Sequence, residues 1–161
     1  MSFTDDSSAA NNFGEFCEKD ERNLEEKIND FRQRAETGDP AAMNDLGACY
    51  YLGVGVEQDF KEAVRQYFRA SETGYSKAMF NLGSCYYLGK GIERNLETAI
   101  SCYRRAANAG HLTATTILGD CYGYGVVVDR DLEEAVKLYR QAAEEGIEEA
   151  KAALERLGEE L

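Results

Sequence analysis

An eight-residue phrase returns three times in this chain, and the spacing is always 36 residues. It is LGACYYLG at 46–53, LGSCYYLG at 82–89 and LGDCYGYG at 118–125. Positions that recur one and two periods later include Ala42, Leu46, Ala63, Tyr67 and Ala70. A period of this length is typical of a solenoid, in which each repeat is a small unit that packs on its neighbours.

Each repeat predicts two helices. In the first repeat, one helix runs from Pro40 to Leu52, because apolar residues recur at steps of three and four, and Gly53 ends it. The second helix begins at the N-cap Asp59 and ends at Gly74. Small residues on facing positions let the two helices approach closely, and tyrosines fill the remaining space.

The chain is therefore predicted to be all-α, with three full repeats and a half repeat at each end. The matched ranges are 23–38 (second helix only), 39–74, 75–110, 111–146 and 147–157 (first helix only, a capping helix). Residues 1–22 do not follow the period. We expect a flexible acidic and polar segment there, with Phe13 and Phe16 packed over the first helix, and a short tail at 158–161.

The repeated positions in the first repeat are Ala42, Leu46, Gly47, Tyr50, Gly53, Gly55, Asp59, Ala63, Tyr67, Ala70 and Gly74. They resemble the Sel-one-like repeat, a relative of the tetratricopeptide repeat, over residues 23–157. The resemblance implies a right-handed α-α superhelix whose concave face is lined by the first helix of each repeat. It also implies a non-enzymatic adaptor or scaffold. The third repeat departs at Val127, where the family has glycine, so we expect its loop to take another backbone shape.

The resemblance also indicates where a partner would bind, because the first helix of each repeat has positions that point away from the core. By register, these partner-binding positions are Asn44, Ala48, Tyr51, Lys77, Phe80, Ser84, Tyr87, Thr116, Asp120 and Tyr124. Their aromatic rings are candidate anchors for a peptide or protein segment. The alternative for Tyr51 and Tyr87 is that they pack against the neighbouring loop.

Charge and composition restrict the classes of partner and the location that we expect for this protein. The net charge is −12 and the pI about 4.6, which disfavours nucleic acid and anionic membranes and weakly favours a basic protein. Neither an export signal nor an apolar run long enough to span a membrane is recognisable, so we expect a cytoplasmic protein with reduced thiols.

The repeated cysteines Cys49, Cys85 and Cys121 fall on the core side of the first helix, which indicates small buried hydrophobic residues. With one histidine and no C-x-x-C pair, the sequence predicts neither a metal site nor a cofactor. Cys17 is the thiol that we expect to be most exposed.

The sequence therefore favours a non-enzymatic scaffold that binds a segment of another protein on its concave face, as a monomer or weak dimer. A narrower alternative is a toxin-neutralising or effector-inhibiting protein. A hydrolase using Cys17 or His111 is a weaker alternative, because no motif places a nucleophile beside a base, and His111 is expected to be a surface turn residue. Self-assembly by end-to-end stacking of the solenoid is a further alternative.

Overall fold

The computed structural model describes residues 21–159, and these residues form eight α-helices and no strand. The helices are α2 (Glu21–Glu36), α3 (Pro40–Leu52), α4 (Phe60–Glu72), α5 (Ser76–Leu88), α6 (Leu96–Asn108), α7 (Leu112–Tyr124), α8 (Leu132–Glu144) and α9 (Glu148–Leu157). Phe13, Phe16 and Cys17, for which the sequence analysis makes predictions, lie outside the described residues.

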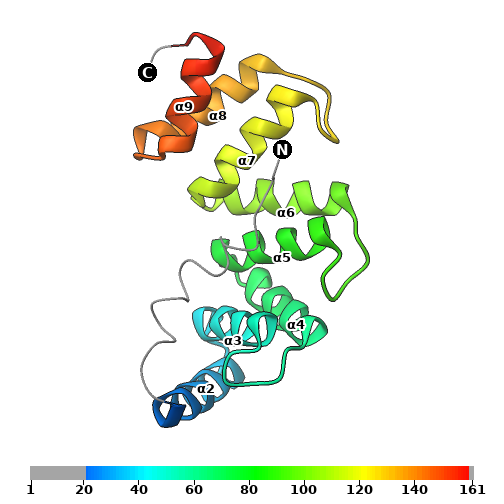
Figure 1. The fold of residues 1–161 in the computed structure, drawn as a ribbon, viewed down its shortest axis with the longest axis vertical. Helices are drawn as coiled ribbons and strands as arrows, with labels where there is room; N and C mark the ends of the chain where they lie inside the picture. Colours follow the sequence, from blue (N-terminus) through cyan, green and yellow to red (C-terminus); the bar gives the residue numbers. More distant parts are fainter. Residues whose placement is uncertain (1–20, 160–161) are drawn as a thin grey trace.

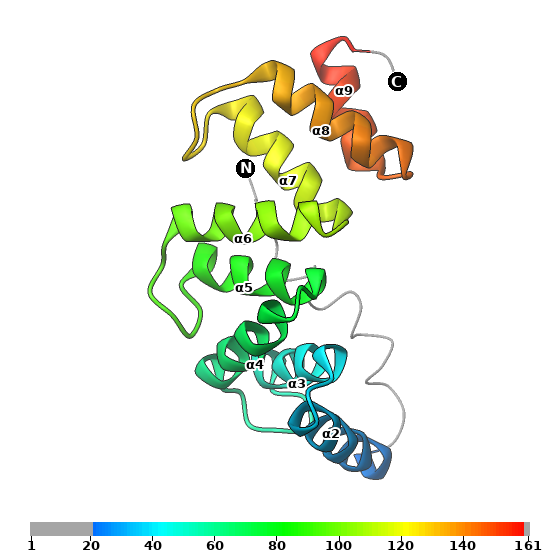
Figure 2. The same cartoon turned by 180° about the vertical axis from the view of Figure 1, so that it is seen from behind.

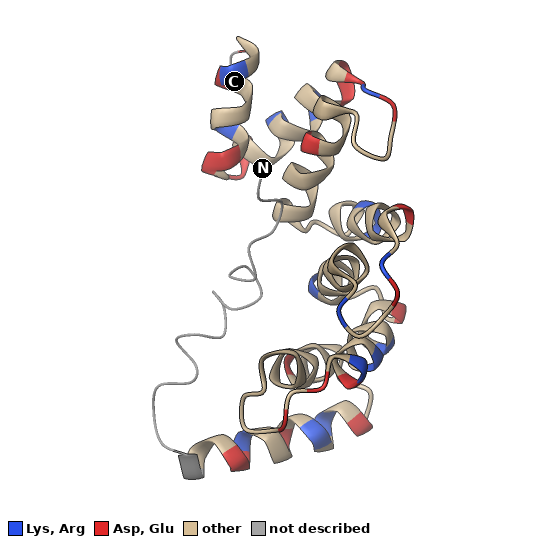
Figure 3. Cartoon of the chain, turned by 45° about the vertical axis from the view of Figure 1, so that its right-hand side comes forward, with Lys and Arg blue, Asp and Glu red and all other residues tan. Residues whose placement is uncertain are grey.

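The helices stack in chain order as a solenoid, which confirms the all-α repeat architecture. Helices α3 and α4, α5 and α6, and α7 and α8 form three pairs, while α2 and α9 lie at opposite ends (Figures 1 and 2). The pairs follow an arc, and α3 and α5 lie nearer its hollow side than α4 and α6 (Figure 3). We call the side formed by α3, α5 and α7 the inner face.

Local chemistry explains the helix ends. The side chain of Asp39 accepts hydrogen bonds from the backbone N–H groups of Ala41 and Ala42 and so caps α3, and Asp59 caps α4 in the same way. At the other end of α3, Gly53 adopts a left-handed conformation with φ of 71°, which glycine reaches without a steric penalty.

Glycine is required where the two helices of each repeat cross. A Cβ atom at Gly47 would lie 2.8 Å from the ring of Tyr67, and one at Gly83 would lie 2.9 Å from the ring of Tyr103. These separations are shorter than real Cβ contacts. The tyrosine ring of the second helix thus lies directly on the bare backbone of the first, as the small-residue pattern predicted.

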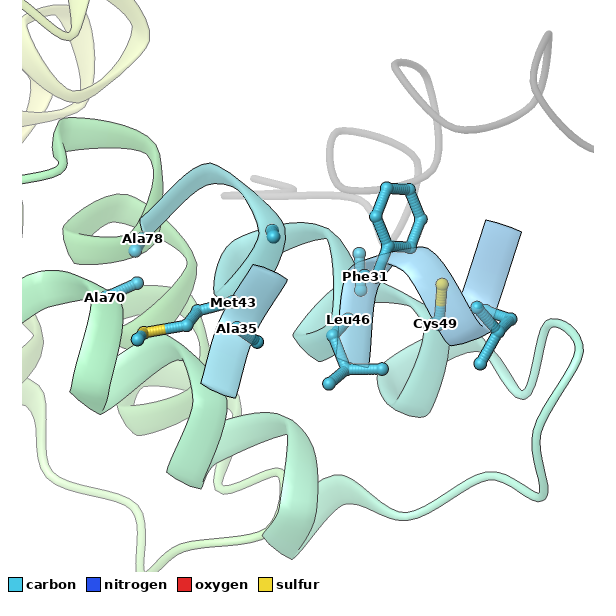
Figure 4. Close-up of a cluster of buried hydrophobic side chains, with 10 residues drawn as sticks. Phe31, Ala35, Met43, Leu46, Cys49, Ala70 and Ala78 are labelled. Atoms are coloured by element: carbon cyan, nitrogen blue, oxygen red, sulfur yellow. The ribbon is translucent and has the colours of Figure 1, made fainter. Parts of the chain in front are cut away.

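The core passes through the whole stack, and one of its clusters joins α2, α3, α4 and the start of α5. Phe31 of α2 lies there near Leu46 and Cys49 of α3, and Ala70 of α4 lies at the other side of the cluster near Met43 (Figure 4). Tyr67, Tyr103 and Tyr139 occupy equivalent buried positions in the three pairs. Each pair therefore completes the core of the pair before it.

The cysteines belong to this core. Cys49, Cys85, Cys102 and Cys121 are buried free thiols. Burial raises the pKa of Cys85 to about 12 and that of Cys121 to about 11, because a thiolate would lose its hydration there. The prediction that the repeated cysteines are small core residues is confirmed.

Val127 differs from expectation. Its loop does not take another backbone shape: Val127 has φ of 66°, against 67° for Gly55 and 72° for Gly91 at the equivalent positions. It is the single non-glycine residue with positive φ among residues 21–159. Val127 therefore keeps the backbone conformation of the two glycines although it is β-branched, a residue type for which positive φ is strained.

Candidate functional site

The inner face carries little charge. Helices α3, α5 and α7 contain one charged residue each, Asp45, Lys77 and Asp120. The acidic and basic residues gather instead on the other helices and on the loops (Figure 3). The inner face is therefore mostly apolar and uncharged.

Two of the expected aromatic anchors are buried. Tyr51 packs edge-on against Phe60, with ring centroids 5.1 Å apart, and is 8% exposed. Phe80 is 5% exposed because His111 stacks on it, with centroids 4.5 Å apart, and Tyr103 flanks it at 5.6 Å. Both rings therefore hold successive helices together, which differs from the expectation that they point away from the core.

Three smaller residues of the expected set are buried as well. Ala48 and Thr116 are 5% and 8% exposed, and the Thr116 hydroxyl donates to the carbonyl of Leu112 within α7. The side chain of Asn44 accepts a 2.9 Å hydrogen bond from Asn81 Nδ2, which joins α3 to α5. These residues position the inner face and do not form its surface.

The other five expected residues remain accessible. Lys77 and Tyr124 are exposed, and Ser84, Tyr87 and Asp120 are half-buried. They extend along α5 and α7.

Partly buried polar contacts fix this accessible set. Asp120 Oδ1 accepts a 2.7 Å hydrogen bond from the hydroxyl of Tyr139, and burial raises the pKa of Asp120 despite that bond. Arg156 of α9 donates to the hydroxyl of Tyr124 at 3.1 Å. Helix α9 therefore contributes a basic group to the C-terminal end of the inner face.

Sequence reasoning missed Asn81, Ile117 and Arg156, although all three remain partly or fully accessible. Asn81 and Ile117 share one register position with Asp45, and an amide among apolar residues was a usable signal. Arg156 gave no such signal, because only the fold brings the capping helix beside Tyr124.

His111 stabilises the start of a helix. It is the N-cap of α7, where its Nδ1 accepts from the backbone N–H of Ala114 at 3.3 Å, and it is half-buried rather than a surface turn residue. Burial lowers its pKa. Cys17, the other residue of the hydrolase alternative, lies outside the described residues.

Within residues 21–159, no group of three or more His, Cys, Asp or Glu side chains is arranged to hold a metal ion. Over the same range, none of the helices is both long enough and apolar enough to cross a membrane.

The family model for the Sel1 repeat matches residues 40–75, 76–111 and 113–147. This chain is a Sel1 repeat protein. Each matched range begins near the first residue of an inner helix and ends just beyond the outer helix of the same pair. Members of the family are generally non-catalytic scaffolds for protein–protein interaction.

Solved structures of Sel1 repeat proteins have the same arrangement. A Sel1 repeat protein from Oxalobacter formigenes is 39% identical, with a TM-score of 0.69 over 71% of this chain and 46% of that one. A protective antigen of uropathogenic Escherichia coli that displays this fold is 29% identical, with a TM-score of 0.75 over 81% of this chain and 29% of its own.

Cysteine rich protein B of Helicobacter pylori is 22% identical, with a TM-score of 0.65 over 84% of this chain and 98% of its own, and it supports the fold alone. The Sel1 repeat chain described here spans less than half the length of the first two relatives. A search of curated proteins gives no match.

Proposed function

We propose that this Sel1 repeat protein is a non-enzymatic scaffold that binds a segment of another protein along its inner face. The observation that carries the proposal is the contrast between the sparsely charged inner helices and the charged outer helices. The accessible groups on α5 and α7 are an ammonium, a carboxylate, a hydroxyl, an amide and aromatic rings. Such a mixture suits a peptide with both apolar and hydrogen-bonding groups.

The preferred partner is a basic protein. The chain has a net charge of −12, so a positively charged segment approaches it faster and from a longer range than an acidic one. This charge also fits the narrower possibility of an inhibitor that covers a basic surface on a toxin or effector. Both roles use the same inner face.

The experiment that tests the proposal compares capture of partners from the native host by wild type and by Asn81→Ala/Tyr87→Ala. Both residues are half-buried and uncharged, so the helices are expected to stay folded, which circular dichroism checks, and the attraction of a basic partner is unchanged. A protein captured by the wild type and lost by this variant supports the inner face. The matched control is Phe68→Ala, because Phe68 is the most exposed large apolar residue on an outer helix, at 52%.

Equal capture by wild type and by the inner-face variant would contradict the proposal and would favour another surface. Variants of Tyr51 or Phe80 are unsuitable for this experiment, because both rings are part of the packing between helices.

A further inference from the structure

The third repeat lacks a tyrosine that the first two repeats have. Tyr51 and Tyr87 occupy one register position near the end of the inner helix, and Gly123 takes that position in α7. Gly123 is helical, and a Cβ atom there would meet its nearest neighbour, the Tyr139 hydroxyl, only at 3.4 Å. Close packing therefore does not require this glycine, unlike Gly119 one turn earlier.

The surroundings of Tyr87 show what the missing ring would contact. Tyr87 lines an apolar pocket with Leu96, Ile100, Tyr103, Ile117 and Cys121. One period later, these residues correspond to Leu132, Val136, Tyr139, Ala153 and Leu157. The third repeat thus has residues equivalent to those around Tyr87, but it has no aromatic side chain at the position of Tyr87.

All five counterparts line open hollows. Tyr139, Ala153 and Leu157 border a cavity of about 50 Å³ beside Gly123, together with Tyr124 and Arg156. Leu132, Val136 and Leu157 border a wider hollow on the adjoining surface. Leu157 borders both hollows. We call them together the Gly123 hollow.

The Gly123 hollow leaves apolar surface uncovered. Leu132, Leu157 and Tyr124 are 41%, 40% and 44% exposed, and they are three of the five large hydrophobic residues that are exposed in residues 21–159. By contrast, Cys121, the counterpart of Leu157, is 6% exposed. Exposed apolar groups gathered in one place are characteristic of binding sites.

We infer that the Gly123 hollow binds a tyrosine or phenylalanine side chain from a segment of another protein. The chain itself shows that this ring fits, because Tyr51 is buried at the equivalent position of the first repeat and Tyr87 forms one wall of the apolar pocket in the second. The guanidinium of Arg156 lies on the rim, where it provides a cationic group for an aromatic face. A second copy is disfavoured as the source, because two chains of charge −12 repel each other. The inference rests on the proposed function and places its anchor between α7, α8 and α9.

The test uses N-acetyl-tyrosinamide as the probe and N-acetyl-alaninamide as its control. Methyl NMR spectra of the whole chain report on Leu132, Val136 and Leu157. We expect saturable shifts of these methyl signals with the tyrosine probe and none with the alanine probe. Absence of saturable shifts up to the solubility limit of the tyrosine probe would overturn the inference.

Two variants at one position separate filling of the hollow from a change in helix stability. Gly123→Tyr restores in the chain the ring of the first two repeats, so we expect it to raise the Tm by about 3 °C and to weaken probe binding at least tenfold. Gly123→Ala adds only a methyl group and should bind the probe as the wild type does. Unchanged probe binding by Gly123→Tyr would show that the probe binds elsewhere.

Two further outcomes would replace the proposed occupant. A mass that rises with concentration for wild type, but not for Gly123→Tyr, would assign the hollow to a second copy. Methyl shifts that follow Phe13→Ala/Phe16→Ala in the absence of probe would assign it to the chain's own N-terminal segment. A captured partner that Asn81→Ala/Tyr87→Ala loses and Gly123→Tyr retains would leave the proposed function standing and remove this inference alone.

Discussion

Tyr139 donates a 2.7 Å hydrogen bond to Asp120, which lies 19 residues earlier on the facing helix. In the second repeat, the same two positions hold Tyr103 and Ser84, whose hydroxyl oxygens lie 3.3 Å apart. In the first repeat they hold Tyr67 and Ala48, and the buried hydroxyl of Tyr67 has no hydrogen-bond partner. At this position, the partner of the core tyrosine is therefore a carboxylate in the third repeat and a hydroxyl in the second, and the first repeat has no polar partner there.

Ala48→Ser is expected to stabilise the protein. By analogy with Ser84, the new hydroxyl lies within reach of the Tyr67 hydroxyl, and a hydrogen bond to a buried unsatisfied group contributes about 1 kcal/mol. Urea unfolding followed by circular dichroism measures the change. The control is the same substitution in a Tyr67→Phe background, where the gain should vanish. An equal gain in both backgrounds would show that Tyr67 is not the partner.

Two glycines on α7 are expected to respond to alanine with opposite signs. Gly119→Ala places a Cβ atom 2.7 Å from the Tyr139 ring, so we expect it to cost about 1–3 kcal/mol through overpacking. Gly123→Ala meets no such contact, so its better helix propensity should add up to about 1 kcal/mol. Thermal unfolding of both variants gives the comparison. A loss of stability in both would show that the second position is also closely packed.

Stability should depend on pH through His111. Because burial lowers its pKa in the folded state, the unfolded chain binds the proton more tightly. The contribution of His111 is therefore complete above its unfolded pKa of about 6.5 and is lost as the pH falls through the folded value. Protonation of Nδ1 also removes the acceptor for Ala114.

His111→Asn keeps a good helix N-cap and removes the titration. We expect the difference in unfolding free energy between wild type and this variant to shrink as the pH is lowered from 7.5 toward 5. A difference that is constant over this range would contradict the assignment to His111.

The core thiols should be unreactive in the folded protein. Cys85 and Cys121 have pKa values of about 12 and 11, so at pH 8 they are protonated as well as buried. An Ellman titration at pH 8 should therefore detect at most the thiol of Cys17 before unfolding and five thiols after it. Rapid reaction of two or more thiols without denaturant would show that the stack opens readily.

Val127→Gly should relieve backbone strain. A β-branched residue with φ of 66° is disfavoured by about 1 kcal/mol or more, although glycine gives back part of this gain through the entropy of the unfolded chain. We expect an unchanged or higher urea midpoint. Val126→Gly is the matched control: Val126 lacks positive φ and helps line the Tyr87 pocket, so its replacement should lower the midpoint.

The helices and their packing could be predicted from the sequence because each depends on signals close together in the chain. Asp59 and Gly53 mark helix ends wherever they stand, and Gly47 with Tyr67 forms a contact that recurs in every repeat. Because the sequence is periodic, each of these signals occurs in all three repeats. Local chemistry and the period therefore determine the fold together.

The inner face was harder to predict because its exposure depends on contacts between repeats that differ from one to the next. Phe80 is covered by His111, whereas the same two positions hold Asn44 and Tyr75 one period earlier and Thr116 and Ile147 one period later. Tyr51 is buried against Phe60, whose counterparts are leucines. The register of a single helix says which way a side chain points, and a neighbouring helix decides whether it is covered.

The contacts of the solenoid are almost confined to successive helices, and this has a mechanical consequence. Within residues 21–159, a pull applied between the two ends is carried mainly through each junction in turn, because few contacts join helices that are not successive. The protein should therefore yield one helix pair at a time, beginning at α9, which packs mainly on α8. Under load, the solenoid should therefore lengthen in steps of one helix pair.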